Sequence, residues 1–383
     1  MMCPRVLVDT VPIVPGKTSV GVQVYLMELL EAIPSAAREQ MRLLCTRSNV
    51  ASFAALEGYR CIVLPWAVEK RPIRVLTQQL AVPFAAAYAD VDVLFEPIDT
   101  AAILAPVPIV TSMHSSHINM ENEQMGLLRR QYNERFLRWT ARRSTRMIAI
   151  SQFVKDSLVE ILEVEPRNID VVYHGGGVVE RAQRQGWLAN SQERDGGILF
   201  VSTLYPHKNA EMLIRAYARL ANERNDLPPL HIVGGDTDGE RPVESGTEQT
   251  RLMRLAHCLD VGESVKLLGR VSDEQLLHLF ATSRLMVFPS SLEGFGLPAL
   301  EAMQAGLPLV ASNKTSVPEI VGEGGLVIDP TSEQAMAEAI EQALFDESTR
   351  AQLKEKGYSR GAQFSWERTA KETLQVLKEA VAS

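Results

Sequence analysis

The chain has 383 residues, of which 46% are hydrophobic and 22% are charged. This length is ample for a large buried core and favours two domains over one. The formal net charge of −8 argues against a protein whose main role is to bind nucleic acid.

Compartment signals are few. The N-terminus leads straight into an apolar run at 5–9 without a signal-peptide pattern, and no apolar run is long enough to cross a bilayer. The four cysteines form no C-x-x-C pair and lie at no metal-ligand spacing from a histidine. We therefore expect a cytoplasmic protein with reduced thiols.

Short apolar runs alternate with helical patterns through the first half. A helix is predicted over 22–33, where apolar residues recur at spacings of three and four. Strands that alternate with helices indicate βαβ units and a parallel sheet. The predicted strands are 5–9, 41–45, 61–64, 91–95, 107–112, 146–151 and 169–173.

The second half repeats this alternation. Its predicted strands are 198–202, 230–234, 264–269, 285–289, 307–312 and 325–329. Its predicted helices are 209–223, 248–259, 273–282, 298–305 and 333–345, followed by an amphipathic C-terminal helix at about 366–381. The polar, Gly-rich segment 174–197 breaks both periodicities and is predicted to be a linker. The domains are thus 1–175, with the C-terminal helix packing back onto it, and 176–365.

One stretch carries a chemical pattern. In SLEGFGLPALEAMQAG (291–306), Glu293 and Glu301 are separated by seven residues that include a Gly-rich loop. Pro298 suits the first turn of a helix, so the preceding loop and the helix N-terminus can form an anion site. An ionised Glu301, one turn into the helix, could accept both hydroxyls of a ribose. The alternative is an ordinary strand–loop–helix with two surface glutamates.

The segment 288–330, with its E-x7-E pattern, resembles the signature region of the retaining nucleotide-sugar glycosyltransferases of family 4. The resemblance extends to 201–220, 267–290 and 364–374, and more weakly to 19–30, 111–117 and 148–158. It implies an α/β protein with the GT-B fold, in which two Rossmann-like domains face a central cleft. The first domain would bind the acceptor and the second the nucleotide sugar.

The resemblance also implies roles for residues of the second domain. Glu301 would hold the ribose hydroxyls, and Glu293 would lie near the hydroxyls of the donor sugar. The backbone amides of Phe295, Gly296 and Leu297 would face the sugar or the diphosphate. Lys208 would bring positive charge to the diphosphate.

Other matches are less complete. Gly21 fits a glycine whose amide nears the diphosphate, and His114 fits a histidine that contacts the donor sugar. The partner of this glycine in relatives is Val20 here, and Gly16 could supply its flexibility. Ser202 stands where some members carry an arginine, so the positive clamp is thinner unless Arg270 assists.

The reaction implied is metal-independent transfer of a hexose, with retention by a front-face route and no cofactor. Mannose from GDP-mannose is favoured and UDP-hexoses come next; the acceptor is a hydroxyl of a glycan, a glycolipid or a small molecule. Asp236 and Asp238 form an Asp-x-Asp pair in a polar loop, which turn chemistry explains as well as a metal site does.

The stretch 129–146 holds seven arginines, with aromatic residues at 132, 136 and 139. Such a helix can lie on an anionic membrane, so peripheral contact with the inner face of the membrane is one expectation. The alternative is a solvated helix whose arginines pack beside the acceptor cleft.

Two other functions stay open. An inactive GT-B partner subunit would bind a nucleotide without transferring or hydrolysing the sugar. A nucleotide-sugar 2-epimerase would need acid and base residues around the sugar, and the sequence shows no such set.

Overall fold

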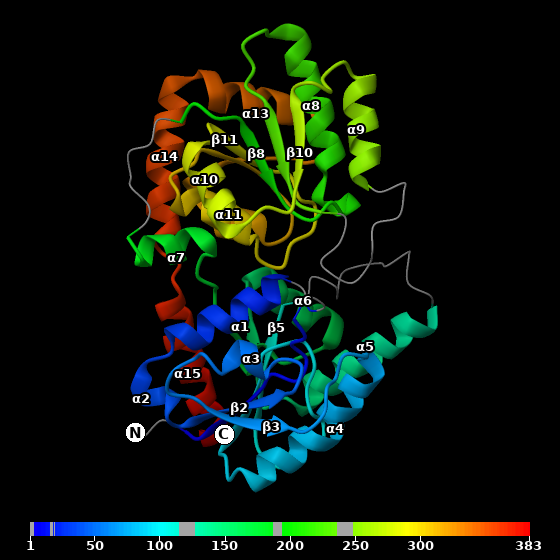
Figure 1. The fold of residues 1–383 in the computed structure, drawn as a ribbon, viewed down its shortest axis with the longest axis vertical. Coiled ribbons are helices and arrows are strands. Elements are labelled where there is room, and N and C mark those ends of the chain that lie inside the picture. Colours follow the sequence, from blue (N-terminus) through cyan, green and yellow to red (C-terminus); the bar gives the residue numbers. More distant parts are fainter. Residues whose placement is uncertain (1–3, 16–17, 19, 115–126, 187–193, 236–247) are drawn as a thin grey trace. The chain divides into compact units, whose positions relative to one another are not determined.

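The computed structural model describes residues 4–15, 18, 20–114, 127–186, 194–235 and 248–383. The chain forms two compact units, one of Met1–His174 with Trp366–Ser383 and one of Gly175–Ser365 (Figure 1). The sequence placed these boundaries at 175/176 and 365/366. The C-terminal helix therefore belongs to the first unit.

The first unit is built on a parallel sheet with the strand order β3-β2-β1-β4-β5-β6-β7. The order reverses between β1 and β4, which lie side by side at its centre. Its strands are β1 (Val6–Asp9), β2 (Met41–Thr46), β3 (Arg60–Leu64), β4 (Val93–Glu96), β5 (Ile109–Met113), β6 (Arg146–Ala149) and β7 (Ile169–Val171).

Helices cover both faces of this sheet. On one face α1 packs beside α15, in blue and red in Figure 1, and on the other α4 contributes Val82, Ala85 and Ala86 to a second core. The helices are α1 (Val20–Ala32), α2 (Ser35–Arg38), α3 (Val50–Phe53), α4 (Arg71–Tyr88), α5 (Leu127–Arg143), α6 (Gln152–Leu162) and α15 (Trp366–Ala382), with the short turn η2 (Pro166–Asn168).

The second unit has a parallel sheet with the order β10-β9-β8-β11-β12-β13, which reverses between β8 and β11. Its strands are β8 (Ile198–Val201), β9 (Leu230–Val233), β10 (Val265–Gly269), β11 (Leu285–Phe288), β12 (Leu309–Ser312) and β13 (Leu326–Ile328). Its helices are α7 (Val178–Arg184), α8 (Ala210–Glu223), α9 (Glu248–Cys258), α10 (Asp273–Thr282), α11 (Leu297–Gln304), α12 (Val317–Val321), α13 (Glu333–Phe345) and α14 (Glu347–Gly361), with the turns η3 (Pro206–Lys208) and η4 (Gly322–Gly324).

Three helices of the second unit were not predicted from the sequence: α7, the short α12 and α14. The predicted linker contains α7, which buries Val179 and Ala182 and contacts α10 and α11. Its seven residues are too few to show a helical period among glycines and charges. Helix α14 was also missed, because it buries Leu353 and two glycines instead of an apolar stripe. Asp346 caps its N-terminus by accepting from two backbone N–H groups.

None of the helices within the described ranges combines the length and the apolar character needed to span a bilayer. Three cysteines lie in those ranges, Cys45, Cys61 and Cys258, and all three are free thiols.

Candidate active site

Lys208 and Glu293 meet where the second sheet reverses its strand order. The loops that carry them follow β8 and β11, which are neighbours, and ligands of open α/β sheets bind at such points. The Nζ of Lys208 lies 2.7 Å from Oε1 of Glu293, and each side chain is only 14% exposed. The structure thus brings together two of the residues predicted from the sequence.

The loop of Lys208 is held by backbone and side-chain contacts. Asn209 adopts a left-handed conformation with φ 60°, and its Nδ2 donates to the carbonyls of Pro289 and Pro330, at 3.2 Å each. Ser291 donates to the carbonyl of His207 through its N–H and its hydroxyl, at 2.8 and 3.0 Å. Asn209 was not among the predicted site residues. The signal that could have indicated it is its residue type, because Asn tolerates a left-handed backbone better than most residues.

The loop of Glu293 is held from the other side by Thr315 and Ser316. The Ser316 hydroxyl lies 3.0 Å from the carbonyl of Glu293 and 3.1 Å from that of Phe295. The N–H of Glu293 donates to Oγ1 of Thr315 at 3.0 Å. These contacts fix the path of the backbone into α11.

Helix α11 begins directly after this loop. Gly296 is its N-cap, with φ 100°, a conformation that L side chains rarely adopt, and Pro298 lies in the first turn as predicted. The Phe295 side chain is buried, with its ring centroid 6.2 Å from that of Phe364. Any ligand here would therefore meet the backbone of 295–297, because the first N–H groups of a helix have no partner within it.

Glu301 contacts a partner that the sequence did not predict. Its carboxylate accepts hydrogen bonds from the N–H groups of Val178 and Val179, at the start of α7. The side chain is 5% exposed. Burial raises the pKa of Glu301 to about 7, and the two hydrogen bonds oppose this shift. A Cβ on Gly177 would lie 2.5 Å from Oε1 of Glu301, so the glycine allows the close approach.

Gln304, one turn further along α11, binds both ends of the second unit. Its Nε2 lies 3.3 Å from the carbonyl of Phe364, near the C-terminal end of the unit. The backbone carbonyl of Gln304 accepts a hydrogen bond from Nε2 of Gln183 on α7, at 2.7 Å. Helix α11 is thereby joined to both segments that lead to the first unit. A Gln at the C-terminal end of a helix gives no sequence signal for this role.

In the first unit, His114 follows β5. Its N–H donates to Oδ1 of Asp99 at 2.6 Å, and its Nε2 lies 2.9 Å from the carbonyl of Pro97. Because a carbonyl only accepts, Nε2 carries the proton and Nδ1 is left as an acceptor. Burial lowers the pKa of His114, so the ring is neutral at pH 7.

Aromatic rings surround His114. The Tyr25 ring lies 4.3 Å away, edge-on, and the His174 ring 5.5 Å away, measured between centroids. His174 in turn stacks on Trp366 at 5.5 Å. Single aromatic residues spread over the chain gave no sign of this cluster.

The remaining predicted residues are placed as follows. Gly21 lies in the first turn of α1, and a Cβ there would meet no atom of the described residues within 4 Å. Arg270 is exposed directly after β10. Gly16, Asp236 and Asp238 lie outside the described residues, so the expectation of a metal-independent reaction stays a prediction.

A buried acidic pair, which was not predicted from the sequence, lies where the first sheet reverses its strand order. Asp9 ends β1, Glu96 ends β4, and both are fully buried. Gln78 of α4 donates to both carboxyl groups, at 3.1 and 3.2 Å. Burial and the nearby Asp9 raise the pKa of Glu96 well above its usual value, so Glu96 is the protonated partner.

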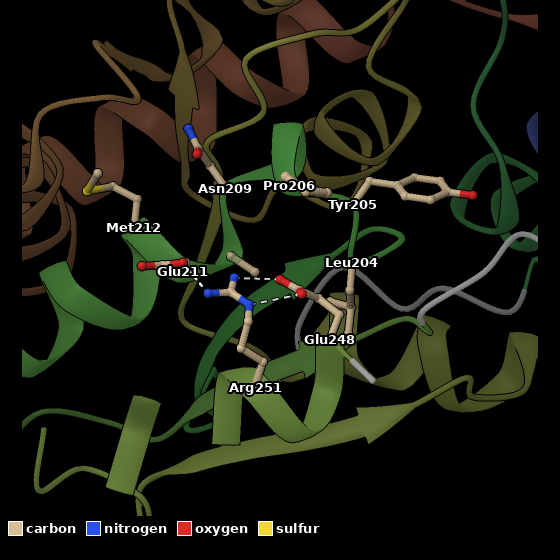
Figure 2. Close-up of a pocket in the computed structure, with 9 residues that line it drawn as sticks. Leu204, Tyr205, Pro206, Asn209, Glu211, Met212, Glu248 and Arg251 are labelled. Carbon is tan, nitrogen blue, oxygen red and sulfur yellow. Dashed lines mark hydrogen bonds and ion pairs between the residues drawn. The ribbon is translucent and has the colours of Figure 1, made fainter. Parts of the chain in front are cut away.

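A surface pocket lies beside the loop of Lys208. It is lined by Leu204, Tyr205, Pro206, Asn209, Ala210, Glu211, Met212, Glu248 and Arg251. Arg251 lies between Glu211 and Glu248, and Tyr205 points away from this group (Figure 2). The Arg251 guanidinium forms ion pairs with the carboxylates of Glu211 and Glu248. Since neither Lys208 nor Glu293 lines it, the pocket is separate from the candidate active site.

Two family models match the chain. "Glycosyltransferase Family 4" matches residues 20–175, and "Glycosyl transferases group 1" matches residues 183–360. Together they cover most of both units. The chain belongs to glycosyltransferase family 4.

Curated relatives agree with this family. The chain is 39% identical over 183 residues to O-antigen chain mannosyltransferase B of Escherichia coli. The matched segment covers 48% of this chain and 46% of that protein. It is 30% identical over 251 residues to D-inositol 3-phosphate glycosyltransferase of Frankia alni, covering 62% and 60%. The chain therefore spans about half the length of the curated relatives that it matches.

Solved structures share the fold of this family 4 chain. Sucrose-phosphate synthase of Thermosynechococcus elongatus superimposes with a TM-score of 0.74 at 21% identity, covering 98% of this chain and 99% of that one. Anabaena Alr3699/HepE in complex with UDP gives a TM-score of 0.72 at 20% identity, with coverage of 98% and 99%. With the two parallel sheets, these likenesses confirm the predicted GT-B fold.

Proposed function

We propose that the protein transfers a hexose from a nucleotide-diphosphate sugar to a hydroxyl group, with retention at the anomeric carbon. The observation that carries this proposal is the joint position of Lys208, Glu293 and the N-terminus of α11 beside the reversal point of the second sheet. A cation and helix N–H groups together suit a diphosphate. The second unit would bind the nucleotide sugar and the first the acceptor.

The leaving nucleoside diphosphate gains negative charge as its bond to the sugar breaks. Lys208 and the amides of 295–297 would stabilise that charge, since they are already in position before the reaction. The Glu301 carboxylate accepts hydrogen bonds from the N–H groups of Val178 and Val179, and its remaining lone pairs can accept hydrogen bonds from ribose hydroxyls. Glu293 would orient Lys208 and the donor sugar.

We propose a front-face route that needs no metal or cofactor. The bond from the anomeric carbon to the diphosphate breaks while the acceptor oxygen bonds to the same face. The acceptor proton passes to the departing phosphate oxygen. This route relies on positioning and charge stabilisation more than on a protein base.

Mannose from GDP-mannose is our preferred donor, because the relative at 39% identity is named a mannosyltransferase. UDP-hexoses come next, since a structural neighbour was solved with UDP. A glycan or lipid-linked acceptor in polysaccharide biosynthesis fits the name of the first relative. Peripheral contact with the inner face of a membrane through 129–146 fits such an acceptor.

The experiment pairs binding with turnover. Thermal shifts with GDP, UDP, ADP and dTDP are measured on the wild type, on Glu301→Gln and on the control Glu323→Gln, whose carboxylate is exposed. At 100 times its Kd, a nucleotide adds about 2.7 kcal/mol to stability. One nucleotide should shift the wild type and the control but not Glu301→Gln.

The matching sugar nucleotide is then incubated with the protein, and the released nucleotide and the configuration of the product are followed by NMR. Release with the retained configuration supports the proposal. Binding without release or transfer would favour the inactive partner subunit, and conversion of the sugar nucleotide to its 2-epimer would favour the epimerase. No shift with any nucleotide would contradict all three.

A further inference from the structure

Helix α4 is apolar on two opposite faces. Its inner face, which includes Val82, Ala85 and Ala86, is buried in the core of the first unit. Its outer face carries five large side chains, which we call the outer stripe. They are Ile73 (45% exposed), Leu76 (60%), Leu80 (60%), Phe84 (74%) and Tyr88 (81%).

The outer stripe is one continuous row. Its members are spaced by three, four, four and four residues, which places them along one side of a helix. Single exposed apolar residues are normal on a protein surface, but contiguous apolar patches mark interaction sites. An apolar helix face is usually packed against another surface, and α4 has such a face on two sides. Something other than the first unit's own core is therefore expected to cover the stripe.

The helix that carries the stripe contains basic but no acidic residues. Lys70, Arg71 and Arg74 lie at its N-terminal end and 70–89 contains no Asp or Glu, while Glu69 and Asp90 stand just outside this range. An anionic surface complements such a helix. A second copy of α4 would offer no acidic partner to the basic end.

Further exposed apolar side chains lie near α4. Trp66 is 43% exposed, and its indole N–H donates to Oγ1 of Thr77 on α4 at 3.2 Å. Gln79 of α4 binds the segment 101–103 by hydrogen bonds to the carbonyl of Ala101 and the N–H of Ile103. Leu104, which follows this segment, is 71% exposed. Tryptophan and tyrosine are enriched where a membrane meets water.

The same segment joins α4 to α5. Thr140 of α5 accepts from the N–H of Ala101 at 3.2 Å, and Arg143 donates to the carbonyl of Ile103 at 2.8 Å. Trp139 of α5 is 54% exposed, and Arg135 and Arg142 are exposed beside it in the sequence. The basic helix noted in the sequence thus packs on the same segment as α4, and α5 adds positive charge.

We propose that the outer stripe of α4 lies on an anionic lipid surface, with the helix in the plane of the interface. The stripe would enter the boundary between headgroups and acyl chains, while the basic N-terminal end of the helix meets the headgroups. This inference rests on the peripheral membrane contact proposed above and deepens it, but it concerns only the first unit and needs no donor. It also makes α4, rather than 129–146, the main contacting element.

The test is co-sedimentation of the full chain with vesicles of phosphatidylglycerol and phosphatidylethanolamine. The wild type should bind them and bind phosphatidylcholine vesicles far less. The variant Leu80→Glu/Phe84→Glu should bind at least about tenfold more weakly, because it removes apolar contacts and adds like charge to an anionic surface. The control Leu268→Glu/Tyr358→Glu changes residues of the second unit that are 41% and 47% exposed, and it should bind like the wild type.

Two further measurements, the melting temperature and its shift on nucleotide binding, distinguish a loss of lipid binding from a loss of folding or of nucleotide binding. Both variants should melt like the wild type and keep its nucleotide-induced shift, since the altered side chains are exposed. A wild type that stays in solution would overturn the proposal, and so would a stripe variant that sediments like the wild type. A dimer seen by light scattering that the stripe variant converts to monomer would overturn it in favour of a second copy.

Discussion

The ammonium group of Lys208 lies 2.7 Å from the carboxylate of Glu293, and the two residues are 85 positions apart in the chain. Their loops follow β8 and β11, which pair in the sheet although two other strands come between them in the sequence. The pair is mostly buried, so it is costly to break by removing one member. A ligand phosphate would share the Lys208 charge without separating the pair.

We predict that Lys208→Ala lowers kcat about 10²–10³-fold, in line with the loss of one preorganised donor that stabilises developing charge. KM for the donor should change less, because the diphosphate charge grows mainly in the transition state. Steady-state kinetics with the sugar nucleotide measure both constants.

The matched control is Lys356→Ala, which removes an exposed lysine paired with Glu323. It should leave kcat unchanged, since exposed ion pairs contribute little. If Lys208→Ala keeps the wild-type kcat, or if both variants lose activity equally, Lys208 does not act on the leaving group.

A second prediction concerns the pH dependence set by Glu301. Its pKa is about 7 in the folded protein and 4.5 for an unperturbed glutamate, so the folded chain keeps a proton that the unfolded chain releases. Stability therefore falls as pH rises from about 4.5 to 7, in total by on the order of 3 kcal/mol. Glu301→Gln should flatten this slope in thermal melts between pH 5 and 8.

The same titration affects ligand binding with the opposite sign. Only the ionised carboxylate accepts two hydroxyl groups, so nucleotide affinity should fall as pH drops below about 7. Isothermal titration from pH 5.5 to 8 tests this. An affinity that does not vary with pH would show that Glu301 does not hold the ribose.

Gly177 and Gly21 form a third test. In Gly177→Ala the new Cβ would lie 2.5 Å from Oε1 of Glu301, so the variant should lose about 1–3 kcal/mol of stability. In Gly21→Ala the new Cβ lies in a helix and meets nothing within 4 Å in the part of the chain that the structure describes, so stability should be unchanged or slightly higher.

Chemical denaturation measures both variants, and donor kinetics separates their causes. If the Gly21 amide lies near the diphosphate, Gly21→Ala should lower kcat/KM for the donor without any loss of stability. Full activity in Gly21→Ala would remove that residue from the donor site. A fully stable Gly177→Ala would show that Glu301 does not approach the start of α7 this closely.

The sequence was sufficient for the strands and for the residues that lie in one continuous motif. The strand β11, the loop with Glu293 and the helix with Glu301 follow one another directly, so their chemistry could be read locally. All thirteen strands of the described ranges match predicted apolar runs, because buried parallel strands give short continuous runs.

Contacts between distant segments could not be predicted in this way. The amides that bind Glu301 belong to α7, inside a predicted linker, and Gln304 reaches Phe364 across 60 positions. Polar side chains at these places look like surface residues until the fold buries them. The outer stripe of α4 could not be predicted either. Its apolar residues have the spacing of an ordinary buried helix face, and only the structure shows that they are exposed.

The last prediction concerns the buried pair Asp9 and Glu96. Burial raises the pKa of Asp9 to about 6, and burial together with the charge of Asp9 raises the pKa of Glu96 well above its usual value. Both pKa values are raised, so above about pH 4 the folded chain holds protons that the unfolded chain releases. The stability of the first unit therefore falls as pH rises. Glu96→Gln imitates the protonated state only in part: its NH2 group can donate to Asp9, but it cannot accept from Gln78 or Ala102 as the oxygens of Glu96 do.

The Glu96→Gln variant should therefore compare better with the wild type near pH 8 than near pH 5, whereas Asp9→Asn/Glu96→Gln should be less stable than Glu96→Gln near pH 8, because a neutral acceptor replaces the charged one. Thermal melts across this range, with hydrogen exchange of β1 and β4 as a local readout, measure the difference. If Glu96→Gln loses stability equally at both pH values, Glu96 is ionised in the folded chain and Gln78 alone holds the pair together.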